Sequence, residues 1–432
     1  METGLKRIAD KARSDESTSF TSLLHHLTPE LVWKHLKKMK INTAVGVDKE
    51  SLEEAKNCFD KWVDAEIQAI HRKGYKAPPV RRVYIPKEGS AKKRPLGIPT
   101  VKDRAIQGAI AEILNNIYEQ DFLKQSFGGR PKLSAHHAVV NLQNGIHSNK
   151  TSFILNLDLE NFFGSVDQGW VMRFLQLRVK DPRIANLIQR WLRAGVIEDN
   201  SYHQAEFGVP QGGPISVLLS NMYLHYSLDL WLEKVVKPRL RGKMEFIRYL
   251  DDCVILFQQK ADLQRVYNTL SMRLNKFSLR LNSDKTKVIQ FGPRAGKSHG
   301  VLDYLGFTFY RTKDRAGRYK IGVKTQKKKL HRAMQRVKML INKNRHKPIA
   351  QQHKEINWLL RGHYNYYGVG DNYSCLWALA RVVFLHWRKQ LSKRSQNGHY
   401  QWSRYLRLLK YFPLCKIKLA VPYRRYADFQ IL

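Results

Sequence analysis

Apolar residues recur every three or four positions in three segments of the chain, which predicts three amphipathic helices. The apolar positions are Ile106, Ile110, Ile113 and Ile117 in the first segment, Leu330, Met334, Val337 and Ile341 in the second, and Trp402, Leu406 and Leu409 in the third. The first helix follows Pro99-Thr100, which is a helix start signal. The second lies within 327–347, where lysines and arginines fill the other faces. Both halves of the chain should therefore contain helices that bury one face.

Two shorter segments are dominated by apolar residues and predict β-strands. They are 153–159, which carries Asp158 near its end, and 246–257, which is interrupted by Asp251-Asp252. The aspartate pair could be a simple hairpin turn, although Gly and Asn, the usual turn partners, are missing. Two adjacent carboxylates at the edge of a core are unfavourable unless a cation joins them. With Asp158 they form a set of three hard oxygen ligands, which is typical of Mg²⁺ sites that complete their coordination with substrate phosphates.

The overall charge indicates the class of partner. The 432 residues include 76 Lys and Arg against 36 Asp and Glu, a formal net charge of +40, and 43% of the residues are hydrophobic. A chain of this kind can bury a large core, and its positive field favours a nucleic acid or an anionic membrane. No apolar run approaches the roughly 18–20 residues that span a bilayer, and the N-terminus lacks the apolar core of a signal peptide. We therefore expect a nucleic-acid-binding protein of the cytoplasm, without a membrane partner.

The positive charge is concentrated in the C-terminal part. Residues 311–432 hold 29 Lys and Arg and four acids, a net charge of 29 − 4 = +25, which places a domain boundary near residue 310. An α+β part should precede this boundary and an all-helical basic domain should follow it. Aromatic and basic residues alternate in that domain, namely Tyr364, Tyr366, Tyr367 and Trp377 with Arg361, His363 and Arg381. The mixture suits stacking on unpaired bases, although a small helical core with a solvated basic face would give the same pattern.

Further motifs surround the aspartates in a fixed order. They are 94–99 with 103–104, 126–131 with 134–136, 207–216, 304–307, 366–369, 394–395 and 412–414. Together with Tyr249-Leu250-Asp251-Asp252 and 158–163, they resemble the motifs of reverse transcriptases of the group II intron, or maturase, type. The resemblance covers nearly the whole chain, and the number and order of its motifs make it highly specific.

This resemblance implies an α+β fold. Residues 1–310 would form right-hand polymerase fingers and palm with an antiparallel palm sheet and an N-terminal extension over about 1–75, and 311–432 a helical thumb, or maturase X, domain. It also implies an RNA-directed DNA polymerase that extends a primer 3′-hydroxyl by two-metal catalysis with two Mg²⁺ ions, for which Mn²⁺ can substitute. The implied partners are dNTPs, an RNA or DNA template–primer and a group II intron RNA. The implied protein is a monomer or homodimer of the bacterial cytoplasm or nucleoid.

The resemblance assigns roles to individual residues. Asp158, Asp251 and Asp252 would be catalytic and, with Leu159, would hold the metals. The nucleotide would be bound by Lys87, Arg94, Phe163, Gln211 and Lys285. The template–primer would contact Pro210, Gly212, Tyr249, Leu250 and Gly306.

Two of these roles have an alternative. Phe163, five positions after the first aspartate, would be an aromatic gate whose ring leaves no room for a 2′-hydroxyl, unless it is an ordinary core phenylalanine. Lys285 would protonate the leaving pyrophosphate, but Lys287 lies close enough in the sequence to compete for that role.

Four residues depart from the family's pattern. Leu250 stands where Ala is usual, and Gly164, Gln168 and Val217 replace Asp, His and Pro. No metal ligand is lost, so the changes concern the biological task. One alternative is a domesticated enzyme that repairs DNA double-strand breaks by extending microhomology-paired ends, and another is an RNA-binding maturase that folds intron RNA. Because the four cysteines are far apart and form no Cys-x-x-Cys pair, the family's Cys/His endonuclease domain is expected to be absent.

Overall fold

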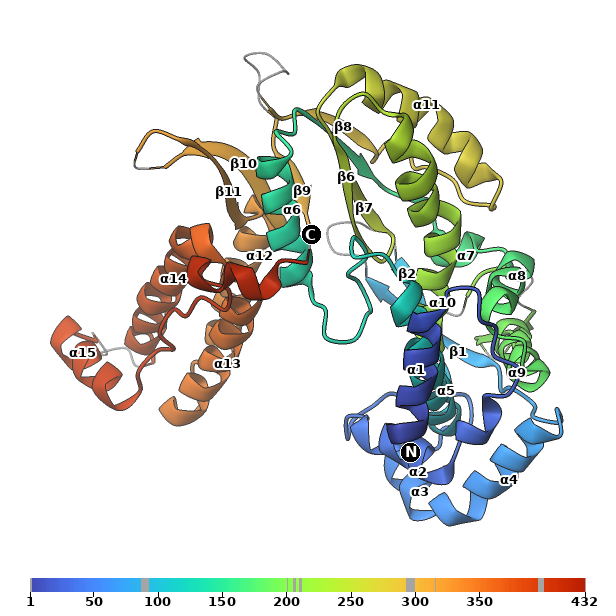
Figure 1. Ribbon diagram of the computed structural model, residues 1–432. Helices are drawn as coiled ribbons and strands as arrows, with labels where there is room; N and C mark the ends of the chain where they lie inside the picture. Colours follow the sequence, from blue (N-terminus) through green and yellow to red (C-terminus); the bar gives the residue numbers. More distant parts are fainter. Residues whose placement is uncertain are drawn as a thin grey trace.

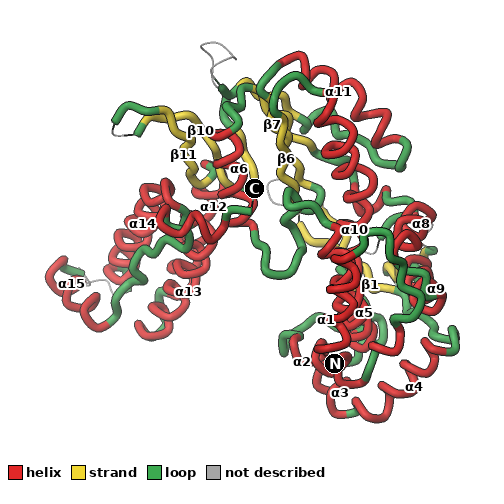
Figure 2. Tube along the Cα trace, in the orientation of Figure 1, coloured by secondary structure: helices red, strands yellow, loops and turns green. Residues whose placement is uncertain are grey.

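The computed structural model describes residues 2–86, 93–199, 201–204, 207–209, 212–292, 300–314, 316–394 and 400–431. The fold is mixed α+β, as predicted, and most of its strand pairs are antiparallel. In Figure 1 the N-terminal helices (blue) and the C-terminal helices (red) lie at opposite ends of the molecule, and the strands of a central sheet lie between them. Figure 2 shows the same division, with strands confined to the middle of the molecule and to the region beside α5.

The N-terminal region is built around one long helix, α5 (Val101–Asp121). Around it lie α1 (Glu2–Ser14), α2 (Pro29–Lys38), α3 (Leu52–Asn57) and α4 (Phe59–His71), and a sheet in the order β2-β1-β4-β5 made of β1 (Val80–Pro86), β2 (Lys93–Ile98), β4 (Val196–Glu198) and β5 (Ser201–His203). The Thr100 side chain accepts a hydrogen bond from the Asp103 N–H and caps α5. The four isoleucines predicted to face the core are all buried, so the predicted helix is confirmed.

The central sheet is antiparallel and has the strand order β6-β7-β3-β8. Its strands are β3 (Phe153–Leu157), β6 (Met244–Tyr249), β7 (Asp252–Phe257) and β8 (Lys287–Gln290). Alternate residues serve two cores: Leu155 and Ile255 join the core of α10 (Pro214–Leu224) and α11 (Lys260–Asn275). Ile154 and Val254 join the core under α6 (Ala135–Ser148). Both predicted strand segments are confirmed, and the second one is a pair of strands.

Three short helices connect the sheet to the N-terminal region. They are α7 (Phe162–Ser165), α8 (Gln168–Arg178) and α9 (Pro182–Arg193). Beyond α10 the helix continues in two π-helical turns, His225–Asp229 and Trp231–Val236. Among the described residues, no helix is both long and apolar enough to cross a membrane.

The prediction that residues 311–432 are all helical is wrong for their first fifteen residues. A three-stranded sheet in the order β11-β10-β9 consists of β9 (Leu302–Tyr304), β10 (Phe307–Lys313) and β11 (Tyr319–Thr325). Its large apolar side chains alternate along the strands, as Phe307 and Phe309 of β10 lie in the core and Phe309 faces Val323 across the β10–β11 pair. The boundary at 310 came from charge, and charge does not report secondary structure, because lysines occupy exposed strand positions as readily as exposed helix positions.

The C-terminal helices begin at Lys327. They are α12 (Lys327–Asn344), α13 (Ile349–Tyr367), α14 (Tyr373–Ser392) and α15 (Trp402–Tyr411), so both helices predicted in this part are confirmed. Val337 and Ile341 of α12 pack in a core with Val383 and Trp387 of α14. Tyr364 is buried in this core, so it is not available for stacking on bases. Trp377 is 50% exposed and remains available.

One buried carboxylate fixes the N-terminal segment to the rest of the fold. Oδ2 of Asp181, at the start of α9, accepts hydrogen bonds from the N–H groups of Leu23 and Leu24 at 2.9 and 3.1 Å. Burial raises its pKa, but hydrogen bonds from the Arg183 side chain and from these N–H groups outweigh burial and lower the pKa of Asp181 to about 2.

Replacing Asp181 with Ala should lower the free energy of unfolding at pH 7 by about 1–3 kcal/mol, because two buried N–H groups lose their acceptor. The folded-state pKa lies below the unfolded value, so this stabilisation is fully present above about pH 4 and is lost as the pH falls through about 2. Urea unfolding should therefore show a smaller difference between wild type and variant at pH 3 than at pH 7. Asp10→Ala, at an exposed ion pair, is the control and should change stability by less than about 0.5 kcal/mol. A difference that is independent of pH would contradict the assignment.

Candidate active site

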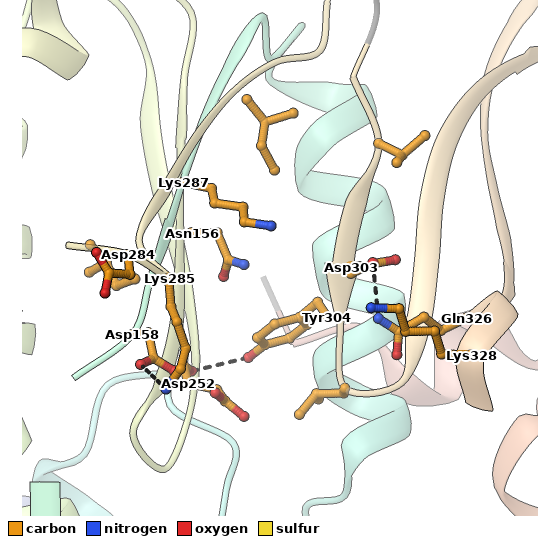
Figure 3. Close-up of a pocket in the computed structure, with 14 residues that line it drawn as sticks. Asn156, Asp158, Asp252, Asp284, Lys285, Lys287, Asp303, Tyr304, Gln326 and Lys328 are labelled. Atoms are coloured by element: carbon orange, nitrogen blue, oxygen red, sulfur yellow. Dashed lines mark hydrogen bonds and ion pairs between the residues drawn. The ribbon is translucent and has the colours of Figure 1, made fainter. Parts of the chain in front are cut away.

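Strand pairing brings the predicted carboxylates to one place. The register of β3 and β7 joins Leu157 to Cys253, so Asp158, just after β3, lies beside Asp252, the first residue of β7 (Figure 3). Burial, followed by the charges of Asp251 and Asp158, raises the pKa of Asp252 to about 6. Burial also raises the pKa of Asp251, with a contribution from Asp158. The three aspartates therefore form one cluster of mutually repelling negative charge.

The turn that carries Asp251 is a strained two-residue hairpin. Tyr249 pairs with Asp252, and Leu250 between them has a φ of +55°, a conformation that favours glycine. The hairpin alternative considered for Asp251-Asp252 is therefore correct as geometry, but the turn carries an acidic cluster as well. Strain of this kind is found where the surroundings hold the backbone, often at functional sites.

Two glycines, Gly128 and Gly129, pack directly against this turn, and we call them its glycine seat. A Cβ added to Gly128 would lie 2.4 Å from the main-chain nitrogen of Leu250, and one added to Gly129 would lie 2.2 Å from Val217 Cγ1 and 3.1 Å from Leu250 Cδ2. A larger residue fits at Gly128 only if the turn moves, and at Gly129 only if the Val217 side chain moves. Leu250 and Val217, two of the four departures from the family's pattern, thus meet at the same glycine, which the sequence order could not show.

A groove of about 410 Å³ opens at Asp158 and Asp252 and runs toward β9 and α12. It is lined by residues of β3, β7, β8, β9 and the start of α12, including Asp284, Lys285, Lys287, Asp303, Tyr304, Gln326 and Lys328 (Figure 3). The Tyr304 hydroxyl donates to the Asp252 carbonyl oxygen at 3.3 Å, which ties β9 to the hairpin that carries Asp251 and Asp252. The acidic cluster is therefore open to a large, partly basic groove.

Lys285 is the cation that contacts the cluster. Its Nζ lies 3.1 Å from Asp158 Oδ2, and the main-chain N–H of Asp158 donates to Thr286 Oγ1 at 3.3 Å. Lys287 lines the same groove but has no ion pair with a described aspartate of the cluster. Among the residues that the structure describes, no three His, Cys, Asp or Glu side chains converge on one point as metal ligands. The side chain of Leu159 has no donor atom, so only its main-chain carbonyl oxygen could contribute to a metal site.

Phe163, the predicted gate residue, lies in the short helix α7. Phe162, its neighbour in α7, is buried in the core, whereas Phe163 is half-exposed and lines a second cavity of about 230 Å³. The main-chain oxygen of Phe163 accepts a hydrogen bond from the Val209 N–H at 2.9 Å. Phe163 also packs against the core that contains Phe162, so its role as a gate stays a prediction.

Of the remaining residues predicted to bind nucleotide or template, the structure describes some and not others. Lys87, Pro210 and Gln211 lie outside the described residues. Arg94 is exposed on β2, and its charge lowers the pKa of both Asp251 and Asp252, which indicates that β2 faces the cluster. Gly212 has a φ of +132°, and an added Cβ would lie 2.4 Å from the Gly97 carbonyl oxygen, so this loop packs directly on β2.

The predicted primer-side residue Gly306 occupies the turn between β9 and β10 with a φ of +79°. Tyr366 of α13 donates from its hydroxyl to the Leu305 carbonyl oxygen at 3.0 Å, and its ring stacks on Phe307. Tyr366 and Tyr367 therefore support this turn from the C-terminal helices, a role that differs from the predicted stacking on bases.

Several residues of the groove are absent from the sequence-based site. Asp303, Gln326 and Lys328 are among them. Gln326 Nε2 donates to Asp303 Oδ2 at 2.9 Å, a contact across 23 residues of sequence. Asp303 adjoins the 304–307 motif, and an acid in so basic a region could have drawn attention. Lys328, one of three consecutive lysines, carries no signal of its own.

Comparisons with known proteins agree with this geometry. Residues 85–309, just over half of the chain, match the family described as reverse transcriptase (RNA-dependent DNA polymerase). The chain is 27% identical to the group II intron-encoded protein LtrA of Lactococcus lactis subsp. cremoris, over 86% of this chain and 74% of LtrA. It is 32% identical to protein YkfC of Escherichia coli (strain K12), over 57% of this chain and 71% of YkfC. It is also 29% identical to a putative COX1/OXI3 intron 2 protein of Saccharomyces cerevisiae, over 51% of this chain and 24% of that protein.

The matched residues contain the acidic cluster, the half-exposed Phe163 and the loop that packs on β2. The relatives indicate the type of reverse transcriptase, since two of the three are intron proteins by name. We conclude that this chain belongs to the reverse transcriptase (RNA-dependent DNA polymerase) family and is an RNA-directed DNA polymerase of the group II intron type.

Proposed function

We propose that the protein extends a primer 3′-hydroxyl with dNTPs, on an RNA or DNA template, at the groove that begins at Asp158 and Asp252. The reaction joins the 3′-oxygen to the α-phosphorus of the nucleotide and breaks the bond from that phosphorus to pyrophosphate. The observation that carries the proposal is the β3–β7 register, which places Asp158 beside Asp252, and both line a groove of about 410 Å³.

The acidic cluster suits divalent metal. The oxygen donors of Asp158, Asp251 and Asp252, with the Leu159 carbonyl, are the kind that Mg²⁺ prefers. Burial, and after it the charges of Asp251 and Asp158, raises the pKa of Asp252, and a bound cation would offset the repulsion between these carboxylates. Lys285 supplies part of the missing positive charge by pairing with Asp158. When bound, two Mg²⁺ ions would activate the 3′-hydroxyl and neutralise charge on the departing pyrophosphate.

Lys285 is the better candidate for the acid that protonates pyrophosphate. Its ammonium group already reaches the Asp158 carboxylate, while Lys287 is set further along β8 in the groove. A lysine so placed can give its proton to an oxygen that gains charge as the phosphorus–oxygen bond breaks. The positive charge of Arg94 acts to lower the pKa of both hairpin aspartates. Arg94 and Lys87 would both bind the triphosphate.

Replacing Asp252 with Asn should lower the rate of primer extension by roughly 10²–10³-fold or more, because a charge that stabilises the transition state is removed. Single-turnover extension on RNA and DNA templates measures the effect. Asp284→Asn, an exposed acid on the same groove, is the matched control and should retain a rate near that of wild type.

Equal extension by Asp252→Asn and wild type would exclude the proposed chemistry. The same assay with primers of different length addresses the alternative role in break repair, which requires efficient extension from short paired 3′ overhangs. An enzyme that needs long preformed duplex would contradict that role.

Replacing Phe163 with Ala should admit ribonucleotides, because the ring that would clash with a 2′-hydroxyl is removed. The ratio of kcat/KM for dNTP to that for the matching rNTP should fall by at least roughly 10-fold, on the order of 1.4 kcal/mol of discrimination. Phe162→Leu is the control, since its side chain lies in the core and should affect stability more than sugar selection. An unchanged preference for dNTP in Phe163→Ala would exclude the gate.

A second activity, binding of structured RNA by the C-terminal helices, is supported by charge and by exposed rings. The net charge of +25 over 311–432 lies mainly on these helices. Arg381 lies 5.4 Å from the centre of the exposed Trp377 ring, and Arg388 lies 3.9 Å from the Trp402 ring. Pairs of this kind bind phosphate and unpaired bases together. The similarity to LtrA, an intron-encoded protein by name, extends over 86% of the chain.

The double variant Trp377→Ala, Arg381→Gln should bind a folded RNA with single-stranded loops roughly 10-fold more weakly, because a stacked base is worth about 1–3 kcal/mol. The slope of log K against log salt should fall by about 1. Trp33→Ala, Lys37→Gln is the matched control, since it removes the same kinds of group from a cation–π pair on α2. Equal loss of affinity in both double variants would contradict a specific site on the C-terminal helices.

A further inference from the structure

A buried cation lies directly beneath the catalytic hairpin. Arg248, on β6, and Asp229 are both fully inaccessible to solvent. Arg248 Nε donates to Asp229 Oδ1 at 2.7 Å and Nη2 donates to Oδ2 at 2.6 Å, a bidentate pair. Desolvating two charges is unfavourable, and such a pair by itself is weak evidence for stability. The other hydrogen bonds of the guanidinium are therefore more informative about its role.

The remaining guanidinium nitrogen holds the hairpin itself. Arg248 Nη1 donates to the Leu250 carbonyl oxygen at 3.0 Å and to Asn221 Oδ1 at 2.9 Å. Leu250 is the residue with the strained positive φ, and its carbonyl begins the peptide unit that leads into Asp251. The guanidinium thus fixes the turn from inside the protein, at the peptide next to two of the proposed metal ligands.

Asn221 extends the same network to the seat of the turn. Its Nδ2 donates to the Gly128 carbonyl oxygen at 2.7 Å, and Gly128 is the residue on which Leu250 rests. The main chain of Arg248 is paired there too, since its N–H donates to Gln125 O and its carbonyl accepts from Phe127 N–H, both at 2.9 Å. The Arg248 side chain therefore joins the hairpin to Asn221 of α10, and through Asn221 to Gly128.

The π-helical turn explains how two residues of one helix reach the arginine. Eight residues of regular α-helix turn through roughly 800°, which would leave Asp229 about 80° away from the direction of Asn221. The turn His225–Asp229 is π-helical, and its wider winding takes more residues per revolution. Asp229 is thereby brought back toward the face that carries Asn221, and both side chains contact Arg248. Such π turns occur frequently at functional sites.

We propose that Arg248 is a positioning residue for nucleotidyl transfer, which sets the Asp251 and Asp252 carboxylates by holding the Leu250 carbonyl and is itself oriented by Asp229 and Asn221. The proposal rests on the proposed function of the groove. It requires that a disturbed network impair the chemical step and metal binding more than the binding of template–primer, since Arg248 is buried and touches neither nucleic acid nor nucleotide.

The test compares Arg248→Lys with a matched variant elsewhere. Lysine keeps the charge beside Asp229 but cannot also satisfy Asn221 and Leu250, because it lacks the fork of the guanidinium. Arg178→Lys is the control: Arg178 is also buried, pairs with Asp121 at 3.2 Å, and donates to carbonyl oxygens, here of the N-terminal segment at Ala12 and Asp15. Both variants lose a buried guanidinium group, but only the one at Arg248 lies beneath the hairpin.

Three quantities are measured for each full-length variant: the Tm, the Kd for template–primer together with the single-turnover rate, and the affinity of the enzyme for Mn²⁺ by electron paramagnetic resonance without substrate. We expect both variants to lower the Tm. Arg248→Lys should reduce the single-turnover rate at least 10-fold and weaken Mn²⁺ binding several-fold, with the template–primer Kd changed less than twofold. Arg178→Lys should change rate and Mn²⁺ affinity less than twofold.

Equal effects of the two variants on rate and Mn²⁺ affinity would overturn the proposal and leave Arg248 with a structural role only. If Arg248→Lys does not fold, Asn221→Ala, which removes one hydrogen bond to the guanidinium and one to Gly128, should give the same pattern with a smaller loss of rate. An unchanged rate and Mn²⁺ affinity in that variant would also overturn the proposal. A wild-type enzyme without polymerase activity would reject the proposed function, while the Mn²⁺ comparison would still decide the role of Arg248.

Discussion

The structure depends on the antiparallel register between β3 and β7. Because Leu157 pairs with Cys253, the residue after one strand lies beside the residue that begins the other, and two aspartates almost a hundred positions apart in the sequence become neighbours. A shift of one residue would turn every side chain of the strand to the opposite face and would exchange the contents of the two cores. The same hydrophobic alternation that builds the cores therefore also determines where the acidic cluster forms.

The cluster is unfavourable in isolation, and its surroundings compensate for it in two ways. Lys285, in the turn before β8, and Arg94, on β2, bring positive charge to the aspartates. The turn between Tyr249 and Asp252 is held in a strained conformation by packing on Gly128 and Gly129 and by hydrogen bonds from within the core. A flexible hairpin could separate its carboxylates and relieve their repulsion. A fixed hairpin keeps them together, which is the arrangement that a bound cation requires.

The sequence predicted what depends on short-range pattern and missed what depends on packing. The helices of 106–117, 327–347 and 402–409 and the strands around Asp158 and Asp251 follow from apolar periodicity, and the structure contains all of them. The β10–β11 pair was misassigned because its lysines resemble those of the helices that follow. The proximity of Leu250 to Val217, and the contact of Arg248 with Asp229 and Asn221, come from segments far apart in the chain, and no local pattern reports them. An arginine within an otherwise apolar strand was nevertheless a visible sign that a buried partner must exist.

Helix α6 relates the catalytic hairpin to the C-terminal part of the chain. One side of it packs in the core that contains Ile247 and Val254 of β6 and β7. From the same helix Gln143 donates to the Ile321 carbonyl oxygen of β11 at 2.6 Å, and His136 Nε2 donates to the Tyr366 carbonyl oxygen at 2.8 Å.

Residues near the C-terminal end of the chain also contact α6. Asn141 donates to the Phe429 carbonyl oxygen at 2.7 Å and accepts from the Ile431 N–H at 2.9 Å. Tyr366 in turn supports the Leu305 carbonyl in the turn at Gly306. One helix thus fixes the last described residues of the chain through direct hydrogen bonds, and through Tyr366 it also supports the turn proposed to contact the primer. Since α6 also packs on β6 and β7, any displacement of the C-terminal helices must either break these bonds or move the sheet, so the turn at Gly306 and the hairpin aspartates are mechanically coupled.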